Sequence, residues 1–175
     1  MTGNPLKTKS IFWIKVNMKF KFTNETRITP SGETIYRIEA IEDIPSRGVK
    51  VGDKGGFVGK SAQVTGDAWV YDNARVTDNT QVYGNAQVYG NAWVSGNARV
   101  YGKAHVSDNA QVYGDAHVSG KAKVYGYALV YGYARVYGNA QVYGYAWVSS
   151  KARVYGNAQV SDNAQVSGDI SGAAP

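Results

Sequence analysis

Every sixth residue from Val58 to Val166 is valine, and this unbroken period constrains the fold more than any other feature of the chain. An alanine follows each valine by four residues as far as Ala164, with Thr80 as the one exception. Side chains alternate across a strand, so the alanine and the next valine face the same side. Gly-Asn, Gly-Asp or Asp-Asn pairs fill the two remaining positions and favour turns. Short strands and turns in strict phase predict a three-sided coil of 18 residues.

The Val…Ala unit resembles the bacterial hexapeptide-repeat family, whose signature is an aliphatic residue with a small residue four positions on. The resemblance covers residues 57–169 and implies an all-β, left-handed parallel β-helix of about six coils. The handedness is implied by the resemblance and not by the period. We therefore expect the hexapeptide-repeat β-helix to span residues 57–169 and a tail to span 170–175.

The segment before the repeats has the pattern of a cap. Residues 19–23 and 34–38 alternate as strands, and the turn sequence Thr29-Pro30-Ser31-Gly32 lies between them, so we expect a β-hairpin over 18–39. A solenoid needs such a cap because its ends expose unpaired strand edges. We expect residues 18–56 to form this β-hairpin cap and residues 1–17 to be a flexible basic lead-in.

A second resemblance covers residues 18–169. A hairpin strand containing Tyr36-Arg37-Ile38, followed by Gly52-Asp53-Lys54-Gly55-Gly56-Phe57-Val58 and Ala-x-Val repeats, is similar to a group of phage and prophage proteins. This resemblance implies a phage origin and, with it, a cytoplasmic location in a bacterial host cell.

Composition sets further bounds. The chain has 175 residues, a net charge of +6 and no cysteine, so a disulfide framework and a thiolate metal site are excluded. The apolar run Ile11-Phe12-Trp13-Ile14 is too short to span a membrane, and we expect no membrane association. Residues 1–56 hold 10 basic and 6 acidic side chains, so the head is basic while the repeats are close to neutral.

Positions one coil apart share a face, so the period assigns every outward side chain to one of three flat faces. The first, the aromatic face, has Phe57, Arg75, Trp93, Gln111, Leu129 and Trp147 in one outward column and Thr77, Ser95, Tyr113, Tyr131 and Ser149 in the other. Exposed tryptophan and leucine over several coils favour a contact surface. The candidate residues for a partner or subunit contact are Phe57, Trp93, Tyr113, Leu129, Tyr131 and Trp147. The family habit implies that the subunit contact is that of a homotrimer.

The second, the arginine face, combines cations with tyrosines. One outward column is Gln63, Gln81, Arg99, His117, Arg135 and Arg153, and the other is Thr65, Tyr83, Tyr101, Ser119, Tyr137 and Tyr155. No acid is expected at an outward position, and basic groups beside tyrosines suit a nucleic acid or another anionic ligand. The candidate residues are Arg99, Tyr101, His117, Arg135, Tyr137, Arg153 and Tyr155. Alternatively, the arginine stems lie on the tyrosine rings and keep the face soluble.

The third, the mixed face, carries no clear functional signal. Its outward columns hold Trp69, Gln87, His105, Lys123, Gln141 and Gln159, flanked by Tyr71, Tyr89, Tyr125 and Tyr143. At one corner Tyr127 and Tyr145 stand one coil apart where asparagine is usual, which is compatible with a wider interface.

Many hexapeptide-repeat proteins are acyltransferases that use a histidine as general base. Here the only two histidines, His105 and His117, are expected on different faces and within regular repeats, without a neighbouring outward carboxylate. We therefore expect no enzyme activity, no catalytic residue, no metal and no cofactor. The sequence favours a non-enzymatic binding or scaffold protein acting on a protein partner, with counter-defence as one role. A nucleic-acid or anionic-ligand binder and an acyltransferase remain as alternatives.

Overall fold

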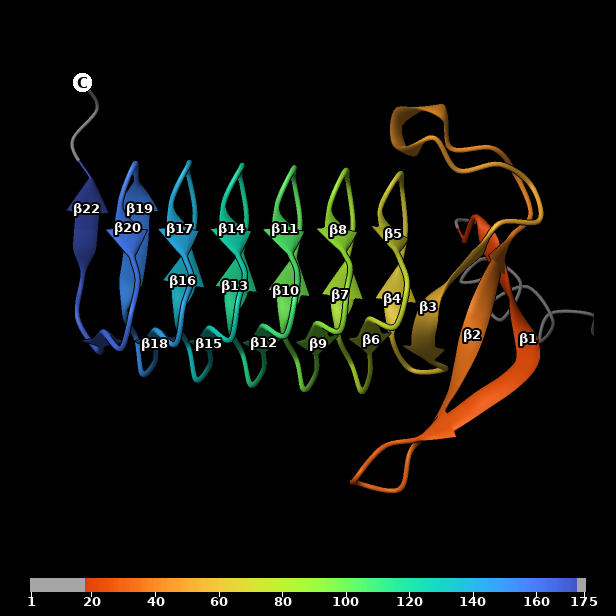
Figure 1. The fold of residues 1–175 in the computed structure, drawn as a ribbon, viewed down its shortest axis with the longest axis horizontal. Coiled ribbons are helices and arrows are strands. Elements are labelled where there is room, and N and C mark those ends of the chain that lie inside the picture. The colour runs from red at the N-terminus through yellow and green to blue at the C-terminus, as the bar shows by residue number, and fades with distance from the viewer. Residues whose placement is uncertain (1–17, 173–175) are drawn as a thin grey trace, which may run out of the picture.

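A computed structural model describes residues 18–172, and these residues form a parallel β-solenoid with an antiparallel hairpin at its N-terminal end (Figure 1). The coils stack along one axis, and the C-terminus lies at the end opposite the hairpin. The predicted all-β solenoid of about six coils and the N-terminal hairpin are confirmed. Its left-handed winding stays a prediction from the resemblance, and the lead-in expected over 1–17 lies outside the described residues.

Three sheets make up the three faces, each joining strands that lie one coil apart. The aromatic face holds β3 (Lys54–Gly59), β6 (Arg75–Val76), β9 (Trp93–Val94), β12 (Gln111–Val112), β15 (Leu129–Val130), β18 (Trp147–Val148) and β21 (Gln165–Val166). The arginine face holds β4 (Gln63–Val64), β7 (Gln81–Val82), β10 (Arg99–Val100), β13 (His117–Val118), β16 (Arg135–Val136), β19 (Arg153–Gly156) and β22 (Ile170–Gly172). The mixed face holds β5 (Trp69–Val70), β8 (Gln87–Val88), β11 (His105–Val106), β14 (Lys123–Val124), β17 (Gln141–Val142) and β20 (Gln159–Val160).

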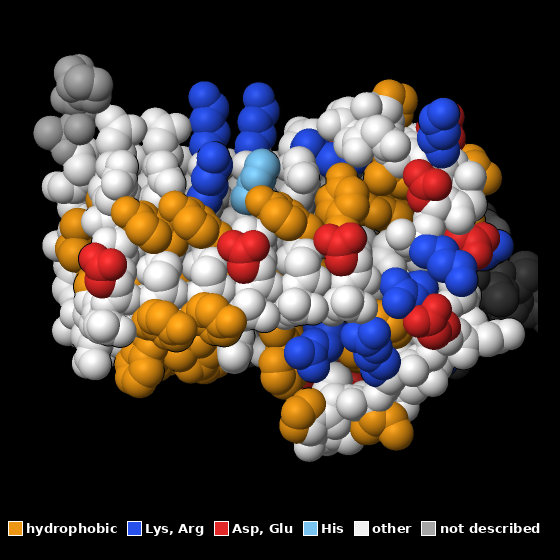
Figure 2. All heavy atoms as spheres, viewed as in Figure 1, with side chains coloured by type: hydrophobic (Ala, Val, Ile, Leu, Met, Phe, Trp, Pro, Cys, Tyr) orange, Lys and Arg blue, Asp and Glu red, His pale blue; other side chains and the backbone are white. Residues whose placement is uncertain are grey.

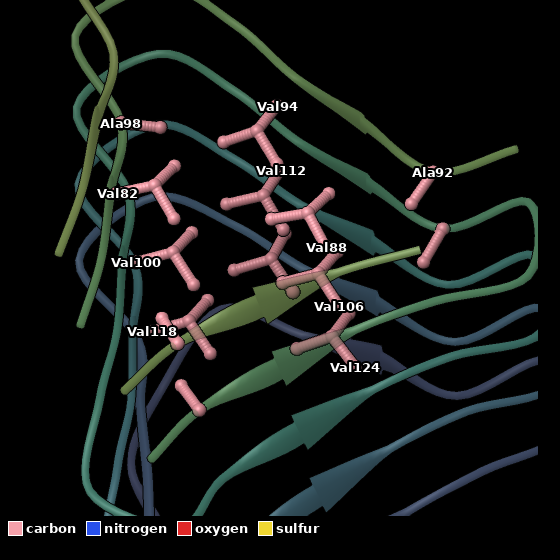
Figure 3. Packing of buried hydrophobic residues seen from close by; sticks show 14 of the residues in the cluster. Val82, Val88, Ala92, Val94, Ala98, Val100, Val106, Val112, Val118 and Val124 are labelled. Carbon is pink, nitrogen blue, oxygen red and sulfur yellow. The ribbon is translucent and has the colours of Figure 1, made fainter. Parts of the chain in front are cut away.

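The interior is the predicted column of valine and alanine. Every valine of the six-residue series from Val58 to Val166 is buried, and Figure 3 shows valines of the three faces pointing toward a common axis. Each buried valine contributes about 1.5–3 kcal/mol of apolar burial. Thr80, which interrupts the alanine series, is also buried, and its hydroxyl donates to the carbonyl of Thr77 at 2.6 Å. The interior thus accepts this one hydroxyl because its hydrogen bond is made locally.

The corners depend on positive φ angles. Glycines at the first corner position, such as Gly114 at φ +69°, lie in the left-handed region. Asp72, Asp78 and Asp108 occupy the same position with φ between +53° and +58°. Their carboxylates accept hydrogen bonds from the glycine amides one coil further on, as in Asp78 to Gly96 at 2.8 Å. The predicted turn chemistry is therefore present.

The cap is the hairpin of β1 (Phe20–Ile28) and β2 (Thr34–Ala40), followed by a loop containing a short 3-10 helix, η1 (Pro45–Arg47). β2 pairs antiparallel with β3, so the hairpin continues the sheet of the aromatic face and closes its end. The loop is tied to a corner of the solenoid, because Arg47 donates to the carbonyl of Asn85 at 2.6 Å and to that of Asp67 at 3.2 Å. No helix among the described residues is long and apolar enough to cross a membrane.

The C-terminal end differs from the expected tail. Residues 170–172 form β22, which pairs with β19 through Ile170 and Val154. The two residues are 16 apart, where every earlier pair on this face is 18 apart, so the last coil is two residues short. The chain therefore stays in the solenoid past the point where the alanine series ends. Residues 173–175 of the expected tail lie outside the described part.

Candidate interaction surfaces

The aromatic face concentrates its exposed rings in the two coils that contain β15 and β18. Leu129 of β15 lies directly beside Trp147 of β18. Tyr131 follows directly after β15, and its amide donates to the carbonyl of Val148 in β18. The corner residues Tyr127 and Tyr145 stack with ring centroids 5.1 Å apart and planes 8° apart. Figure 2 shows hydrophobic side chains gathered along one edge over these coils. The aromatic patch is defined here as Tyr127, Leu129, Tyr131, Tyr133, Tyr145 and Trp147.

Exposure identifies the anchors of this patch. Tyr127, Tyr133 and Tyr145 are 53%, 62% and 58% exposed, and Trp147 is 41% exposed. Leu129 and Tyr131 are half-buried between them. Large contiguous apolar patches on soluble proteins often mark contact surfaces. The patch is thus the strongest candidate contact surface in the described part of the chain.

Phe57 is a correction to the predicted contact surface. Its side chain is completely buried, and the guanidinium carbons of Arg27 and Arg37 lie 3.9 and 4.4 Å from its ring centroid. The hairpin covers this coil, so Phe57 belongs to the junction between cap and solenoid. Trp69 of the mixed face is buried in the same way, with the ring of Phe20 packed against it at 6.4 Å.

Two other predicted contact residues are partly engaged within the chain. Trp93 is half-buried, donates from Nε1 to the hydroxyl of Thr77 at 3.1 Å, and lies under Arg75. Tyr113 stacks on Tyr131 with centroids 5.0 Å apart and planes 3° apart. Both extend the aromatic patch toward the middle of the solenoid, but their rings are less available to a partner than those of the patch itself.

The arginine face has the predicted columns. Arg99, His117, Arg135 and Arg153 are consecutive neighbours along the sheet. Burial, with Arg99 and Arg135 beside it, holds the pKa of His117 below its usual value, against a smaller opposing effect of Asp115. The tyrosines stack in two pairs, Tyr83 on Tyr101 and Tyr137 on Tyr155.

Arg153 does not have the acid-free surroundings that the sequence predicted. The short last coil brings Asp169 beside it, and Nη2 of Arg153 lies 3.0 Å from a carboxylate oxygen of Asp169. Asp169 thus neutralises the charge of Arg153, which reduces its repulsion with Arg135. The sequence feature that could have predicted the Arg153–Asp169 pair is the end of the six-residue repeat at Ile170, because residues beyond that point no longer follow the 18-residue spacing.

Two hollows open on the arginine face. One, of about 350 Å³, is lined by Tyr133, Arg135, Lys151 and Arg153 at the corner shared with the aromatic face. The other, of about 260 Å³, lies between Tyr101 and Tyr137 with Ser119 beneath it. A third hollow, on the mixed face, lies between Tyr89 and Tyr125. The predicted site residues did not include Lys151, Ser107 or Ser119, which also line these hollows.

Comparison with known proteins agrees with the stacked coils. Four segments are similar to the YdcK beta solenoid repeat, over residues 68–84, 92–108, 134–150 and 152–168. Each matched segment is about one coil long, so this resemblance is to the repeating unit. Among curated proteins, none matches the chain. The matched repeats and the three stacked sheets together identify the chain as a repeat β-helix protein with a parallel β-solenoid fold.

Proposed function

We propose that this chain is a non-enzymatic binding protein that docks on a protein surface through the aromatic patch. One observation carries the proposal: six outward tyrosine, leucine and tryptophan side chains lie together on two adjacent coils. Tyrosine and tryptophan are the residues that most often dominate the energy of protein–protein contacts. They also lose little conformational freedom on binding, because each has only two side-chain torsions.

The scaffold supports this use of the patch. Main-chain hydrogen bonds link every rung, as between the Leu129 amide and the Ala146 carbonyl at 2.9 Å. The rings of Tyr127 and Tyr145 already stack on each other within the chain. A preorganised surface avoids part of the entropy cost of association, so a small patch can bind well.

A homotrimer, which the resemblance to hexapeptide-repeat proteins implies, would use the same patch between copies of the chain. The resemblance to phage proteins would place the partner in a bacterial cytoplasm, with counter-defence as the role. Both statements rest on resemblance, and both lead to the same contact surface.

The test replaces Leu129 and Trp147 together by glutamine, the residue that the same column carries at Gln111 and Gln165. These substitutions should leave the solenoid intact. Tyr83→Ser, an exposed tyrosine on the arginine face whose column carries Ser119, is the matched control. Light scattering at micromolar concentration reports self-association, and a photoreactive residue at Gln111, at the edge of the patch, reports contact with another protein in cells.

An oligomer that the double variant dissociates, and that Tyr83→Ser leaves intact, identifies the patch as the subunit contact. A monomer that forms a defined photo-adduct, lost in the double variant, identifies a different protein as partner. A monomer without an adduct, or an oligomer and adduct unchanged by the double variant, contradicts the proposal.

The absence of catalysis is part of the proposal. His105 lies in β11 of the mixed face and His117 in β13 of the arginine face, so the two cannot act on one substrate in one copy. Within residues 18–172 no three histidine, cysteine or acidic side chains are grouped as metal ligands. Titration with acetyl-CoA tests the acyltransferase alternative, and saturable binding would favour it.

A further inference from the structure

The tyrosine ladder of the arginine face lacks one rung. Tyr83 and Tyr101 stack with centroids 4.9 Å apart, and Tyr137 and Tyr155 stack at 5.2 Å, with planes 1° and 6° apart. Ser119 occupies the position between the two pairs. Two coil spacings, about 10 Å, therefore separate Tyr101 from Tyr137. A planar ring placed between them would lie about 5 Å from each, within the range of stacked aromatic groups.

The gap is a formed slot. A hollow of about 260 Å³ lies there, with Tyr101 and Tyr137 as its ends and Ser119 as its floor. His117 forms a side wall, since its ring meets that of Tyr101 edge-on at 6.4 Å and 75°. Arg135 lines the same hollow from the neighbouring outward column. Arg135 is exposed, and no ion pair with it is found among the described residues.

The mixed face repeats this construction. Ser107 interrupts the ladder between Tyr89 and Tyr125, and His105 meets Tyr89 edge-on at 6.2 Å and 78°. The chain's two histidines thus each stand two residues before a serine that breaks a tyrosine ladder. Figure 2 shows such a break in a row of hydrophobic side chains, with a histidine above it and an acidic side chain below.

The two slots differ in access and in charge. Ser107 is only 5% exposed, whereas Ser119 is partly buried and more accessible. Asp108 and Lys123 both line the slot above Ser107, so the negative charge of Asp108 offsets the positive charge of Lys123 there. Arg135 and Arg153 line the slot above Ser119, and only Arg153 has an acidic partner, Asp169. An anionic ligand therefore favours the Ser119 slot.

We propose that the slot above Ser119 binds a nucleotide, with its base between Tyr101 and Tyr137 and its phosphate on Arg135. Every nucleobase has a π face that can stack on tyrosine, and arginine binds phosphate through two parallel N–H groups. Arg135 is two residues from Tyr137 along the chain, about 6.6 Å in an extended strand. The base-binding slot lies on the arginine face, and Arg135 at its edge also lines the corner hollow with Tyr133 of the aromatic patch. The nucleotide can be free or an unpaired nucleotide of a single strand.

Calorimetric titration of the full chain with AMP at about 50 mM salt tests the proposal. Adenosine and ribose 5-phosphate carry the base and the phosphate separately, and each should bind at least about fivefold more weakly than AMP. Ser119→Tyr restores the missing rung and fills the slot. Ser107→Tyr makes the same change on the mixed face and is the matched control.

AMP binding that Ser119→Tyr abolishes and Ser107→Tyr preserves supports the proposal. Tyr137→Ser and Arg135→Gln give independent checks through residues that the same columns already carry, serine at 119 and glutamine at 81. Each should weaken AMP binding at least about fivefold, and Arg135→Gln should leave the affinity for adenosine unchanged. Far-UV circular dichroism confirms that each variant is folded.

No AMP binding at millimolar concentration, or equal loss in both tyrosine variants, overturns the proposal. So does binding of an acidic tyrosine-containing peptide in the slot when AMP does not bind. Oligoadenylate that binds more tightly than AMP, and loses this binding in Ser119→Tyr, supports the site and identifies single strands as the source. Equal affinity per nucleotide supports the site and identifies free nucleotides.

Discussion

Substitutions of Gly114 by alanine and by aspartate should separate two energies at the corners of the solenoid. Gly114 has φ +69°, a region that costs a residue with a side chain about 1–2 kcal/mol. A Cβ atom there would also lie 3.1 Å from the amide nitrogen and 3.2 Å from the carbonyl oxygen of Gly132 in the next coil. We therefore expect Gly114→Ala to lower the free energy of unfolding by about 1–2 kcal/mol.

Aspartate at the same position should cost less. Asp78 occupies this corner two coils earlier at φ +57°, and its carboxylate accepts a hydrogen bond from the Gly96 amide at 2.8 Å. The carboxylate introduced by Gly114→Asp would face the Gly132 amide in the same way. Such a bond contributes about 0.5–1.5 kcal/mol, so Gly114→Asp should be about 1 kcal/mol more stable than Gly114→Ala.

The measurement is the midpoint of urea unfolding, followed by circular dichroism at constant temperature. Gly168→Ala is the control, because a Cβ at Gly168 meets no atom within 4 Å, and we expect a change within about 0.5 kcal/mol. Equal stability of the alanine and aspartate variants, or a Gly114→Ala variant as stable as the unchanged chain, would refute the reasoning about the corner.

Three further predictions use the same urea measurement. Phe57→Ala should cost about 3–5 kcal/mol, because this ring is fully buried under the hairpin, and Phe57→Leu should cost clearly less. Val124→Ala removes two buried carbons from the middle of the interior and should cost about 2 kcal/mol. The pKa values of His105 and His117 are lowered, mainly by burial, so the unfolded chain binds more protons as the pH falls below 6.5. Stability should therefore be full well above pH 6.5 and decrease as the pH falls below 6.5 toward the lowered pKa values of the folded chain, and replacing both histidines by glutamine should make this decrease shallower.

The six-residue period predicted the fold down to the register of the strands. Because the period is held without a slip from Val58 to Val166, arithmetic on it placed Arg99, His117 and Arg135 beside one another, as the sheet does. It also placed Leu129 beside Trp147. At every repeat the turn residues and the small interior side chains favour the same coil geometry, so the period alone is enough to predict the strand register.

The period could not predict what covers the coils. Phe57 and Trp69 occupy outward positions by phase, yet both are buried because residues from the cap lie over them. Their contacts with Arg27 and Phe20 join segments far apart in sequence. A repeat argument describes neighbouring coils only, so tertiary contacts made by a segment outside the repeat remain invisible to it.

The same limit applies at the other end. The pairing of Ile170 with Val154 saves two residues in the last coil and brings Asp169 to Arg153. Phase arithmetic would have placed Gly172 beside Val154. The short coil pairs Arg153 with Asp169, whereas Arg135 has no ion pair among the described residues, so the predicted repulsion between the two arginines is reduced.

Departures from the repeat therefore mark the candidate sites of this chain. A regular coil presents the same chemistry as its neighbours and offers a ligand no preferred position along the axis. A position is defined only where a column changes, as at Ser119 within a tyrosine ladder or at Tyr127 where asparagine is usual. Both changes leave the valine and alanine interior untouched, so they cost the fold little. A single substitution in a surface column can thus open a hollow between two tyrosines, and the two histidine-flanked serines show this arrangement on two faces of one solenoid.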